Sequence, residues 1–323
     1  MVNRRWIVAS GLLVVSMYFI SELVVKKELI FPVLVALTLG SWVFGNPFWT
    51  SRPFYIWLSP TLAAATSIGL NQLFSIPTLY AVWVLIAFVG LQLYLLHSSV
   101  TPSLATAILP VYLQIDTWYY VPSVGVFTAV VATLLKWKMR RSSPEPAAKR
   151  EVGIQGRMRA WLWRKDEVLQ WVVVLIGVVV ISFLTFSLHW LFIMAPPLIV
   201  TFYEFTRKET LLYKKALRLI LLMAAASLFG TLSLASVHLA AGLPVWLSVV
   251  VTFGWMLLVF HWLQLPFAPA AAISLLPTVI PREYLWLYPL EVTLGASLFT
   301  GLGLLYWLVT IKRRVKQVEP VTR

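Results

Sequence analysis

The segment TPSLATAILP, residues 101–110, occurs in the chain a second time as APAAAISLLP, residues 268–277. Each copy has a proline at its second position and another at its tenth, with small and aliphatic residues between them. The match extends outward, because four prolines recur at one constant displacement: Pro77, Pro102, Pro110 and Pro122 against Pro244, Pro269, Pro277 and Pro289. The sequence therefore predicts a tandem repeat of two halves.

A second pair of matching motifs lies upstream of these segments. AAATSIG at residues 63–69 matches AAASLFG at residues 224–230. The displacement of this pair is shorter than that of the prolines by six, since 224 − 63 is 161 and 244 − 77 is 167. We therefore expect the loops that follow the two motifs to differ in length.

The composition indicates a membrane protein. The chain is 60% hydrophobic and only 12% charged, whereas a soluble domain is about 25% charged. Its mean hydropathy is +0.85, and apolar runs of about 20 residues recur along its length, which is the signal of transmembrane helices. We expect an all-α polytopic membrane protein of about 10–12 segments, each half including one short helix framed by prolines.

The net charge of +14 does not require a nucleic acid partner. The basic residues stand at the ends of apolar runs and in the centre of the chain, as the positive-inside rule describes. Attraction to anionic headgroups of the lipid bilayer accounts for them. The absence of cysteine excludes disulfides, thiolate metal sites and cysteine nucleophiles.

The distribution of charge divides the chain. We predict a first membrane repeat over residues 1–136, a basic linker over 137–167, a second membrane repeat over 168–311 and a basic tail over 312–323. Because the N-terminus, linker and tail are all basic, we expect all three in the cytoplasm, on the inner side of a plasma membrane. Within the linker, residues 154–163 have two interpretations: a short amphipathic piece lying on the membrane, or part of a solvated linker, which we favour.

Placing both ends of each half in the cytoplasm requires an even number of crossings. The segment framed by prolines is short for a full crossing, since an α-helix rises about 1.5 Å per residue and the hydrocarbon core is about 30 Å thick. If the segment crosses, each half has six crossings and the repeats are parallel, which we favour. If it is re-entrant, each half has five and the repeats are inverted.

A helix that begins with proline and is rich in small residues has two possible roles in a membrane bundle. Its first N–H groups lack partners within the helix and carry partial positive charge, so a small anion can dock there, as at the broken helices of transporters. The alternative is a helix that packs closely against its neighbours. The candidate ligand groups are the first backbone N–H groups of each segment, at residues 103–105 and from Ala270 to 272, and the hydroxyls of Thr101, Ser103, Thr106 and Ser274.

Ionisable residues within apolar runs are further candidates, because a charge in the bilayer is costly and is retained for function. Glu291 lies just inside the last span, and Glu204 ends a span three residues before Arg207, with which it can form an interfacial ion pair. His97 and His261 precede the two segments framed by prolines and can relay protons; the alternative is a hydrogen-bonded histidine at the interface.

The second half resembles the HPP family of small integral membrane proteins, which carry a His-Pro-Pro-Ala signature before a helix of small residues. The matching stretch is HWLQLPFAPAAAISLLP, residues 261–277, preceded by IMAPPLIVTFYEF, residues 193–205; the first half gives the same order with SVTPSLATAILP, residues 99–110. Val100-Thr101-Pro102 and Phe267-Ala268-Pro269 stand where the family has His-Pro-Pro. Some family members are linked to nitrite transport across plastid-type membranes, so the resemblance implies transport of a small anion.

Enzyme motifs are absent from the sequence: it has no phosphate-binding loop, no HExxH, no GxSxG and no paired carboxylates within a span. We therefore expect no enzyme, no metal site and no cofactor; the sequence leaves the oligomeric state open. The favoured function is a transporter or channel for a small solute, such as an inorganic anion, at the interface of the two repeats. The alternative is a membrane scaffold or regulatory subunit that binds a partner or anionic lipid through its basic linker.

Overall fold

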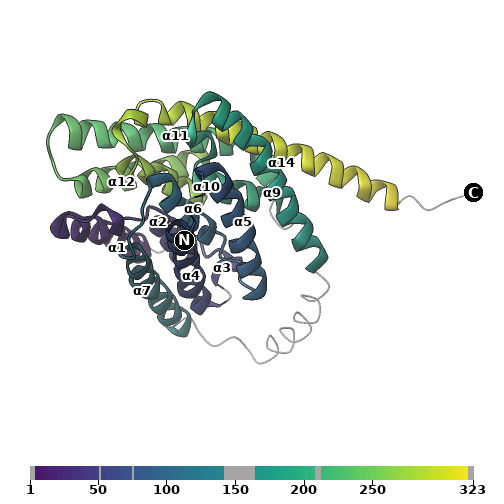
Figure 1. Cartoon of the computed structure of the whole chain (residues 1–323). Helices are drawn as coiled ribbons and strands as arrows, with labels where there is room; N and C mark the ends of the chain where they lie inside the picture. The colour runs from purple at the N-terminus through teal and green to yellow at the C-terminus, as the bar shows by residue number, and fades with distance from the viewer. Residues whose placement is uncertain (1–3, 51, 75, 142–163, 208–211, 319–323) are drawn as a thin grey trace, which may run out of the picture. The chain divides into compact units, whose positions relative to one another are not determined.

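The computed structural model describes residues 4–50, 52–74, 76–141, 164–207 and 212–318 (Figure 1). Every regular element in these ranges is helical. Seven helices there are long and apolar enough to cross a membrane: Arg4–Val24, Thr78–Leu95, Tyr120–Arg141, Val168–Leu188, Leu212–Ala240, Val245–Leu263 and Tyr288–Val309. The prediction of an all-α polytopic membrane protein is confirmed.

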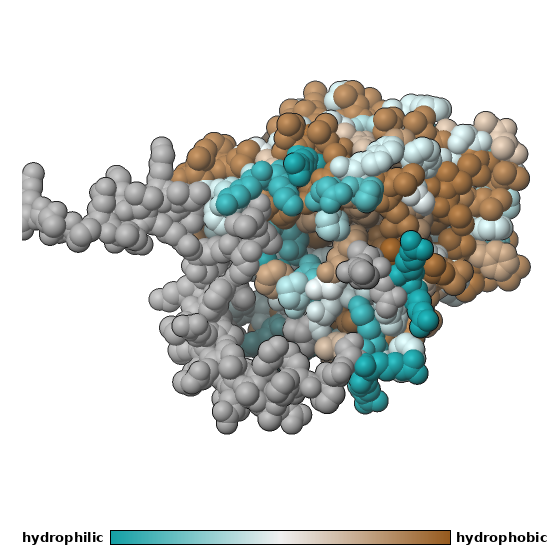
Figure 2. All heavy atoms as spheres, turned by 180° about the vertical axis from the view of Figure 1, so that it is seen from behind, coloured by the Kyte–Doolittle hydropathy of each residue, from teal (hydrophilic) through white to brown (hydrophobic). Residues whose placement is uncertain are grey.

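The surface agrees with a membrane environment. Figure 2 shows brown, hydrophobic atoms over a broad part of the visible face. Large apolar side chains on the long helices are more than half exposed, among them Leu12 at 66%, Phe183 at 62% and Leu305 at 59%. Soluble proteins seldom expose apolar patches of this extent, whereas lipid chains cover them without cost.

The contacts divide the chain into two units, Met1–Ile176 and Gly177–Arg323. The boundary falls inside helix α9, Arg164–Leu188, rather than in the predicted linker over 137–167. Helix α7 continues to Arg141, past residue 136 where we predicted the end of the first repeat. Residues 142–163, including the predicted amphipathic piece, lie outside the described residues, so the linker stays a prediction.

Prolines begin or precede several helices of the first unit, where their missing N–H is not needed. Pro53 and Pro102 start helices, and Pro77 directly precedes one. The elements of this unit are α1 (Arg4–Val24), η1 (Lys27–Leu29), α2 (Val33–Thr38), η2 (Leu39–Val43), α3 (Pro47–Thr50), α4 (Pro53–Leu73), α5 (Thr78–Leu95), α6 (Pro102–Leu113) and α7 (Tyr120–Arg141).

The short helix α2 with its π-helical continuation η2 runs alongside α7 in the same direction. At one end, Ser123 donates a hydrogen bond to the carbonyl of Leu29 at 2.6 Å. At the other end, the Lys138 ammonium donates to the carbonyl of Trp42 at 2.6 Å, and the Trp42 ring lies 5.7 Å from that of Trp6 at the start of α1. We call these the Ser123 end and the Trp6 end of the first unit. The segment from residue 29 to 43 therefore traverses the unit despite its shortness.

Helix α4 runs in the opposite direction to α7. Its first residues lie near the Trp6 end, since Arg52 and Lys136 line one cavity. Its last turn lies at the Ser123 end, where the Gln72 amide donates to the carbonyl of Asp116 at 2.7 Å and accepts from the Trp118 indole at 2.8 Å. A loop of four residues, 74–77, then leads into α5, which returns toward the Trp6 end.

The helix framed by prolines, α6, completes the path. Ser59, near the start of α4, donates to Ser98 at 2.8 Å, which places the beginning of α6 toward the Trp6 end. Asp116, directly after α6, lies beside Gln72 at the opposite end. Six segments therefore traverse the first unit, and the chain enters and leaves it at the same end. Of the two alternatives for the segment framed by prolines, this path favours a crossing segment and not a re-entrant one.

The second unit carries helices of the same kind in the same order. After α9 come η3 (Leu191–Met194), α10 (Pro196–Thr206), η4 (Leu212–Lys215), α11 (Ala216–Ser233), η5 (Leu234–Ala240), α12 (Val245–Leu263), α13 (Ala268–Leu275), η6 (Leu276–Thr278), η7 (Arg282–Tyr284) and α14 (Tyr288–Val318). The short helix α10 again runs alongside the last helix in the same direction: Gly295 of α14 faces Ile193, and Gly303 faces Phe205. The predicted tail begins as a continuation of α14, which reaches Val318.

The prediction of loops of different length after the two matching motifs is wrong. Helix α4 ends four residues after Gly69, whereas α11 continues past Gly230 through the π-helix η5 to Ala240. The loops that follow, 74–77 and 241–244, both have four residues. The six extra residues of the second half are therefore accommodated by a longer helix.

Candidate functional site

The two short helices framed by prolines are buried over almost all of their residues. In α6 every residue from Pro102 to Val111 is buried, and in α13 every residue from Ala268 to Leu275 is buried. Small side chains make this possible, because they let a neighbouring backbone approach closely. An ideal Cβ on Gly230 of α11 would lie only 2.0 Å from the carbonyl oxygen of Ser274, so α11 and α13 touch backbone to backbone.

The hydroxyls predicted as ligand groups in the first unit are buried on α6. Thr106 is 0% exposed and donates to the carbonyl of Pro102 at 3.2 Å. Ser103 is also 0% exposed, and its hydroxyl has no hydrogen-bond partner in the described part of the chain. Thr101 is 1% exposed and directly precedes the helix. Ser103 is therefore the member of this set whose hydroxyl is available to a ligand.

The first backbone N–H groups of these helices already have partners. The N–H of Ser103 donates to the carbonyl of Val100 at 3.2 Å, and that of Leu104 donates to Thr101 at 3.0 Å. In the second unit, the N–H of Ala270 donates to the carbonyl of Phe267 at 3.1 Å. An anion at either helix start would have to replace these bonds, since a helix attracts anions mainly through N–H groups that lack partners.

A buried tyrosine holds each of the two helices at equivalent places. Tyr120, the first residue of α7, donates to the carbonyl of Thr106 at 2.9 Å. Tyr288, the first residue of α14, donates to the carbonyl of Ile273 at 2.7 Å. The two acceptors match the register of the predicted repeat, because 273 − 106 equals 277 − 110, the displacement of the repeated prolines, whereas the two tyrosines are displaced by 288 − 120 = 168. Neither tyrosine was predicted from the sequence as a functional residue, although each begins the last span of its half.

Glu291 lies one turn into α14 and is fully buried, at 0% exposure. Its Oε2 accepts a hydrogen bond from the backbone N–H of Phe192 in η3 at 2.6 Å. Its Oε1 is buried without a hydrogen-bond partner among the described residues. Because Tyr288 lies one turn earlier on the same helix, the carboxyl group and the α13 helix are linked through one turn of α14.

The first unit makes the corresponding junction with a neutral side chain. Ser123 lies three residues after Tyr120, as Glu291 lies three residues after Tyr288. It joins α7 to η1 through its bond to the carbonyl of Leu29, as Glu291 joins α14 to η3. The two bonds differ in direction, because Ser123 donates to a carbonyl whereas Glu291 accepts from an N–H, and the displacement of 167 residues pairs Glu291 with Val124 rather than with Ser123.

The other ionisable candidates lie apart from this buried set. His97 and His261 are exposed, and His97 adopts a left-handed backbone conformation, φ 52°, with its Nδ1 3.0 Å from the carbonyl of Leu95. Glu204 and Arg207 form an ion pair at 3.4 Å at the end of α10, and both are more than nine-tenths buried. Both side chains are enclosed by the protein, and the place of this pair at the membrane interface stays a prediction.

Ser274 completes the predicted set. It is 1% exposed and donates to the carbonyl of Ala271 at 2.8 Å, one turn back on its own helix. The structure thus brings Ala270, Ser274 and Glu291 into one part of the second unit, and Thr101, Ser103 and Thr106 into one part of the first. The two histidines join neither group.

Comparison of the chain with protein-family models, curated proteins and solved structures finds no match. The resemblance to the HPP family therefore stays a prediction that rests on the motifs quoted above.

Proposed function

We propose that the chain is a tandem-repeat transporter for a small solute in which Glu291 carries a proton. The observation that supports this proposal is the burial of the Glu291 side chain and its hydrogen bonding. It is fully buried in a helix long and apolar enough to cross a membrane, with one oxygen bonded and the other without a partner in the described residues. An ionisable group buried in this way is costly, and proteins retain it in membrane helices where it binds or relays a charge.

Packing alone does not account for the carboxyl group. The N–H of Phe192 needs only an acceptor, and the oxygen of a neutral hydroxyl or amide side chain can supply one. A hydroxyl at this junction avoids the desolvation cost of a carboxylate, which amounts to several kcal/mol for an unpaired ion in a protein interior. Retaining glutamate here therefore favours a role in chemistry over one in structure.

The proposed substrate is a small inorganic anion, such as nitrite, which moves together with a proton. An ionised Glu291 would repel an anion, whereas a protonated carboxyl group has an O–H that can donate to it. Within the second unit the start of α13 at Ala270 is the remaining candidate contact, and an anion there would replace the bond from the Ala270 N–H to the carbonyl of Phe267. The resemblance to the HPP family, in which some members are linked to nitrite transport, supports the same choice of substrate.

Uptake by reconstituted protein tests the proposal. Proteoliposomes that contain a pH-sensitive dye are challenged with nitrite, nitrate, formate or chloride, and vesicles without protein correct for leakage of the undissociated acids. We expect the wild type to take up at least one anion with acidification of the lumen. Glu291→Gln should abolish the proton movement, while Glu283→Gln, which removes an exposed carboxylate from η7 of the same unit, should leave it unchanged.

A second variant tests the helices framed by prolines. Ser103→Leu/Ala270→Leu places bulk at the start of both helices and should abolish anion uptake in vesicles where the protein is folded. If folded wild type moves none of the four anions, the transport proposal is wrong. The alternative, a membrane scaffold or regulatory subunit, then replaces the transport proposal. That alternative is tested by measuring whether the basic linker binds anionic lipid or a cytoplasmic protein.

A further inference from the structure

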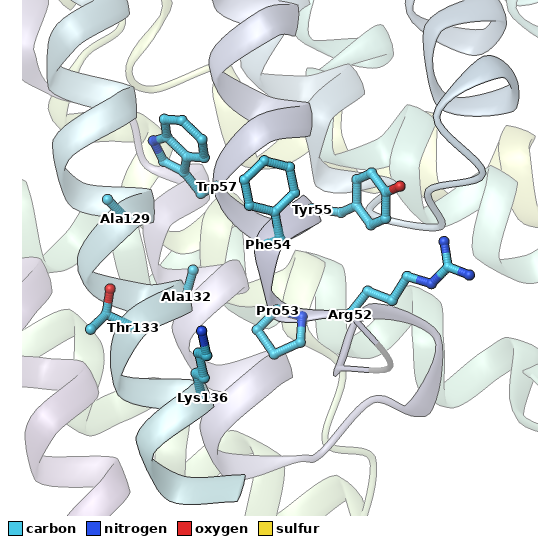
Figure 3. A pocket seen from close by; sticks show the side chains of 9 residues that line it. All are labelled: Arg52, Pro53, Phe54, Tyr55, Trp57, Ala129, Ala132, Thr133 and Lys136. Carbon is cyan, nitrogen blue, oxygen red and sulfur yellow. The ribbon is translucent and has the colours of Figure 1, made fainter. Parts of the chain in front are cut away.

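A cavity of about 490 Å³ lies in the first unit between the start of α4 and the second half of α7 (Figure 3). This volume is in the range of small-molecule and cofactor sites, about 300–1,000 Å³. The residues that line it are Arg52, Pro53, Phe54, Tyr55 and Trp57 on one side and Ala129, Ala132, Thr133 and Lys136 on the other. None of the residues predicted for transport takes part in it.

The charged residues that line the cavity are both basic, and they lie at one end of it. Arg52 and Lys136 line its mouth, and no acidic residue lines it. In the described residues neither cation makes an ion pair; Arg52 lies over the ring of Tyr55, 5.8 Å from its centre. In Figure 3 the two cations lie on either side of Pro53; the Lys136 ammonium points up along α7, and the Arg52 guanidinium extends away from Lys136 on the side of Tyr55. An anionic group placed there meets two positive charges and no negative one.

The rest of the wall is mostly apolar, apart from the hydroxyls of Tyr55 and Thr133, and belongs to α4 and α7. Ala129 lies seven residues before Lys136 on α7, about 10 Å further along the helix. Phe54 and Trp57 face the same space from α4, and Phe54 is 57% exposed. The cavity thus has a cationic mouth at the Trp6 end of the unit and apolar walls that extend from it, open to the surroundings of the helices.

We propose that this cavity binds an anionic phospholipid. The phosphate group lies between Arg52 and Lys136, and the first part of an acyl chain runs along Phe54, Trp57 and Ala129. Basic pockets between transmembrane helices have the chemistry to hold such headgroups. A soluble phosphate compound would use the two cations but would leave the apolar walls against water, so the two parts of the cavity together select a lipid. The inference does not depend on transport.

Lipid binding to purified protein tests this inference. The protein is stripped of lipid in detergent and titrated with phosphatidylglycerol or phosphatidylcholine of the same acyl chains, and bound lipid is counted by native mass spectrometry. We expect the wild type to bind phosphatidylglycerol in preference to phosphatidylcholine. Arg52→Gln/Lys136→Gln should weaken phosphatidylglycerol binding on the order of 30-fold, from the contribution of two basic residues near a membrane surface.

Two further variants separate charge from cavity. Lys214→Gln/Lys215→Gln removes the same charge from η4 of the other unit, outside the cavity, and should leave the binding unchanged. Ala129→Phe fills the apolar part of the cavity and keeps both cations. It should weaken lipid binding although the variant has the same unfolding temperature as the wild type. Glycerol 3-phosphate, the headgroup chemistry without acyl chains, should not compete with the lipid.

Three results would overturn the inference. They are equal binding of the two lipids by the wild type, undiminished phosphatidylglycerol binding by Arg52→Gln/Lys136→Gln, and full competition by glycerol 3-phosphate. The last result would assign the cavity to a soluble phosphate compound.

Discussion

Replacing Gly230 by alanine should destabilise the second unit, although alanine is the better helix former. Gly230 lies in α11, and an ideal Cβ on it would stand 2.0 Å from the carbonyl oxygen of Ser274 and 2.8 Å from the carbonyl carbon. Real Cβ contacts essentially never fall below 3.0 Å, so the two backbones must separate by about 3.0 − 2.0 = 1.0 Å. The obstacle is main chain, which cannot turn aside as a side chain does.

The surroundings oppose this separation. Helix α13 is also held by the bond from Tyr288 to the carbonyl of Ile273, the residue before Ser274. Overpacking in a well-packed interior costs about 1–3 kcal/mol, and the better helix propensity of alanine returns at most about 1 kcal/mol. We therefore expect Gly230→Ala to lower the free energy of unfolding by about 1–2 kcal/mol.

The measurement is reversible unfolding in mixed micelles, followed by the fluorescence of the 16 tryptophans. Gly254→Ala in α12 is the matched control, because a Cβ on Gly254 meets nothing within 4 Å. This control should be neutral or slightly more stable than the wild type. Equal stability of the two variants would show that the backbone contact between α11 and α13 does not exist as described, and the reasoning would be refuted.

Three further predictions concern hydrogen bonds between elements, each measured by the same unfolding assay. Tyr120→Phe and Tyr288→Phe should each cost about 0.6–1.7 kcal/mol, the range of such bonds in membrane proteins, and a loss in only one of them would contradict the equivalence of the two junctions. Glu291→Leu should be less stable than Glu291→Gln by about 1 kcal/mol, because only the amide can still accept from Phe192; equal stability would argue against that bond. Trp307→Phe should cost about 1 kcal/mol through the lost 2.9 Å bond to the carbonyl of Phe205, and an unchanged unfolding curve would exclude it.

Hydropathy and proline spacing predicted the helices well, because both act locally. Apolar runs of the length that is typical of transmembrane helices form α5, Thr78–Leu95, and α12, Val245–Leu263. Pro102 and Pro269 begin or nearly begin short helices, since proline lacks the N–H that a helix start leaves without a partner.

The contacts between helices could not be predicted, because they join residues far apart in the chain. Nothing near Phe192 in the sequence identifies Glu291, 99 residues later, as its hydrogen-bond partner. The predicted anion site at Ser103 rested on free N–H groups, and only the backbone geometry shows that the carbonyls of Val100 and Thr101 already occupy them. The cavity beside Arg52 likewise depends on how α4 and α7 pack.

The π-helical end of the long helix has a consequence for how the protein can change in evolution. Gly230 lies against α13 and Pro244 directly precedes α12, and the six residues by which the second half is longer than the first lie between these two points. A π-helix takes in extra residues by widening its turn, without breaking the chain of hydrogen bonds. We therefore expect the protein to tolerate a change of length within Leu234–Ala240, with the turns on both sides of it keeping their register.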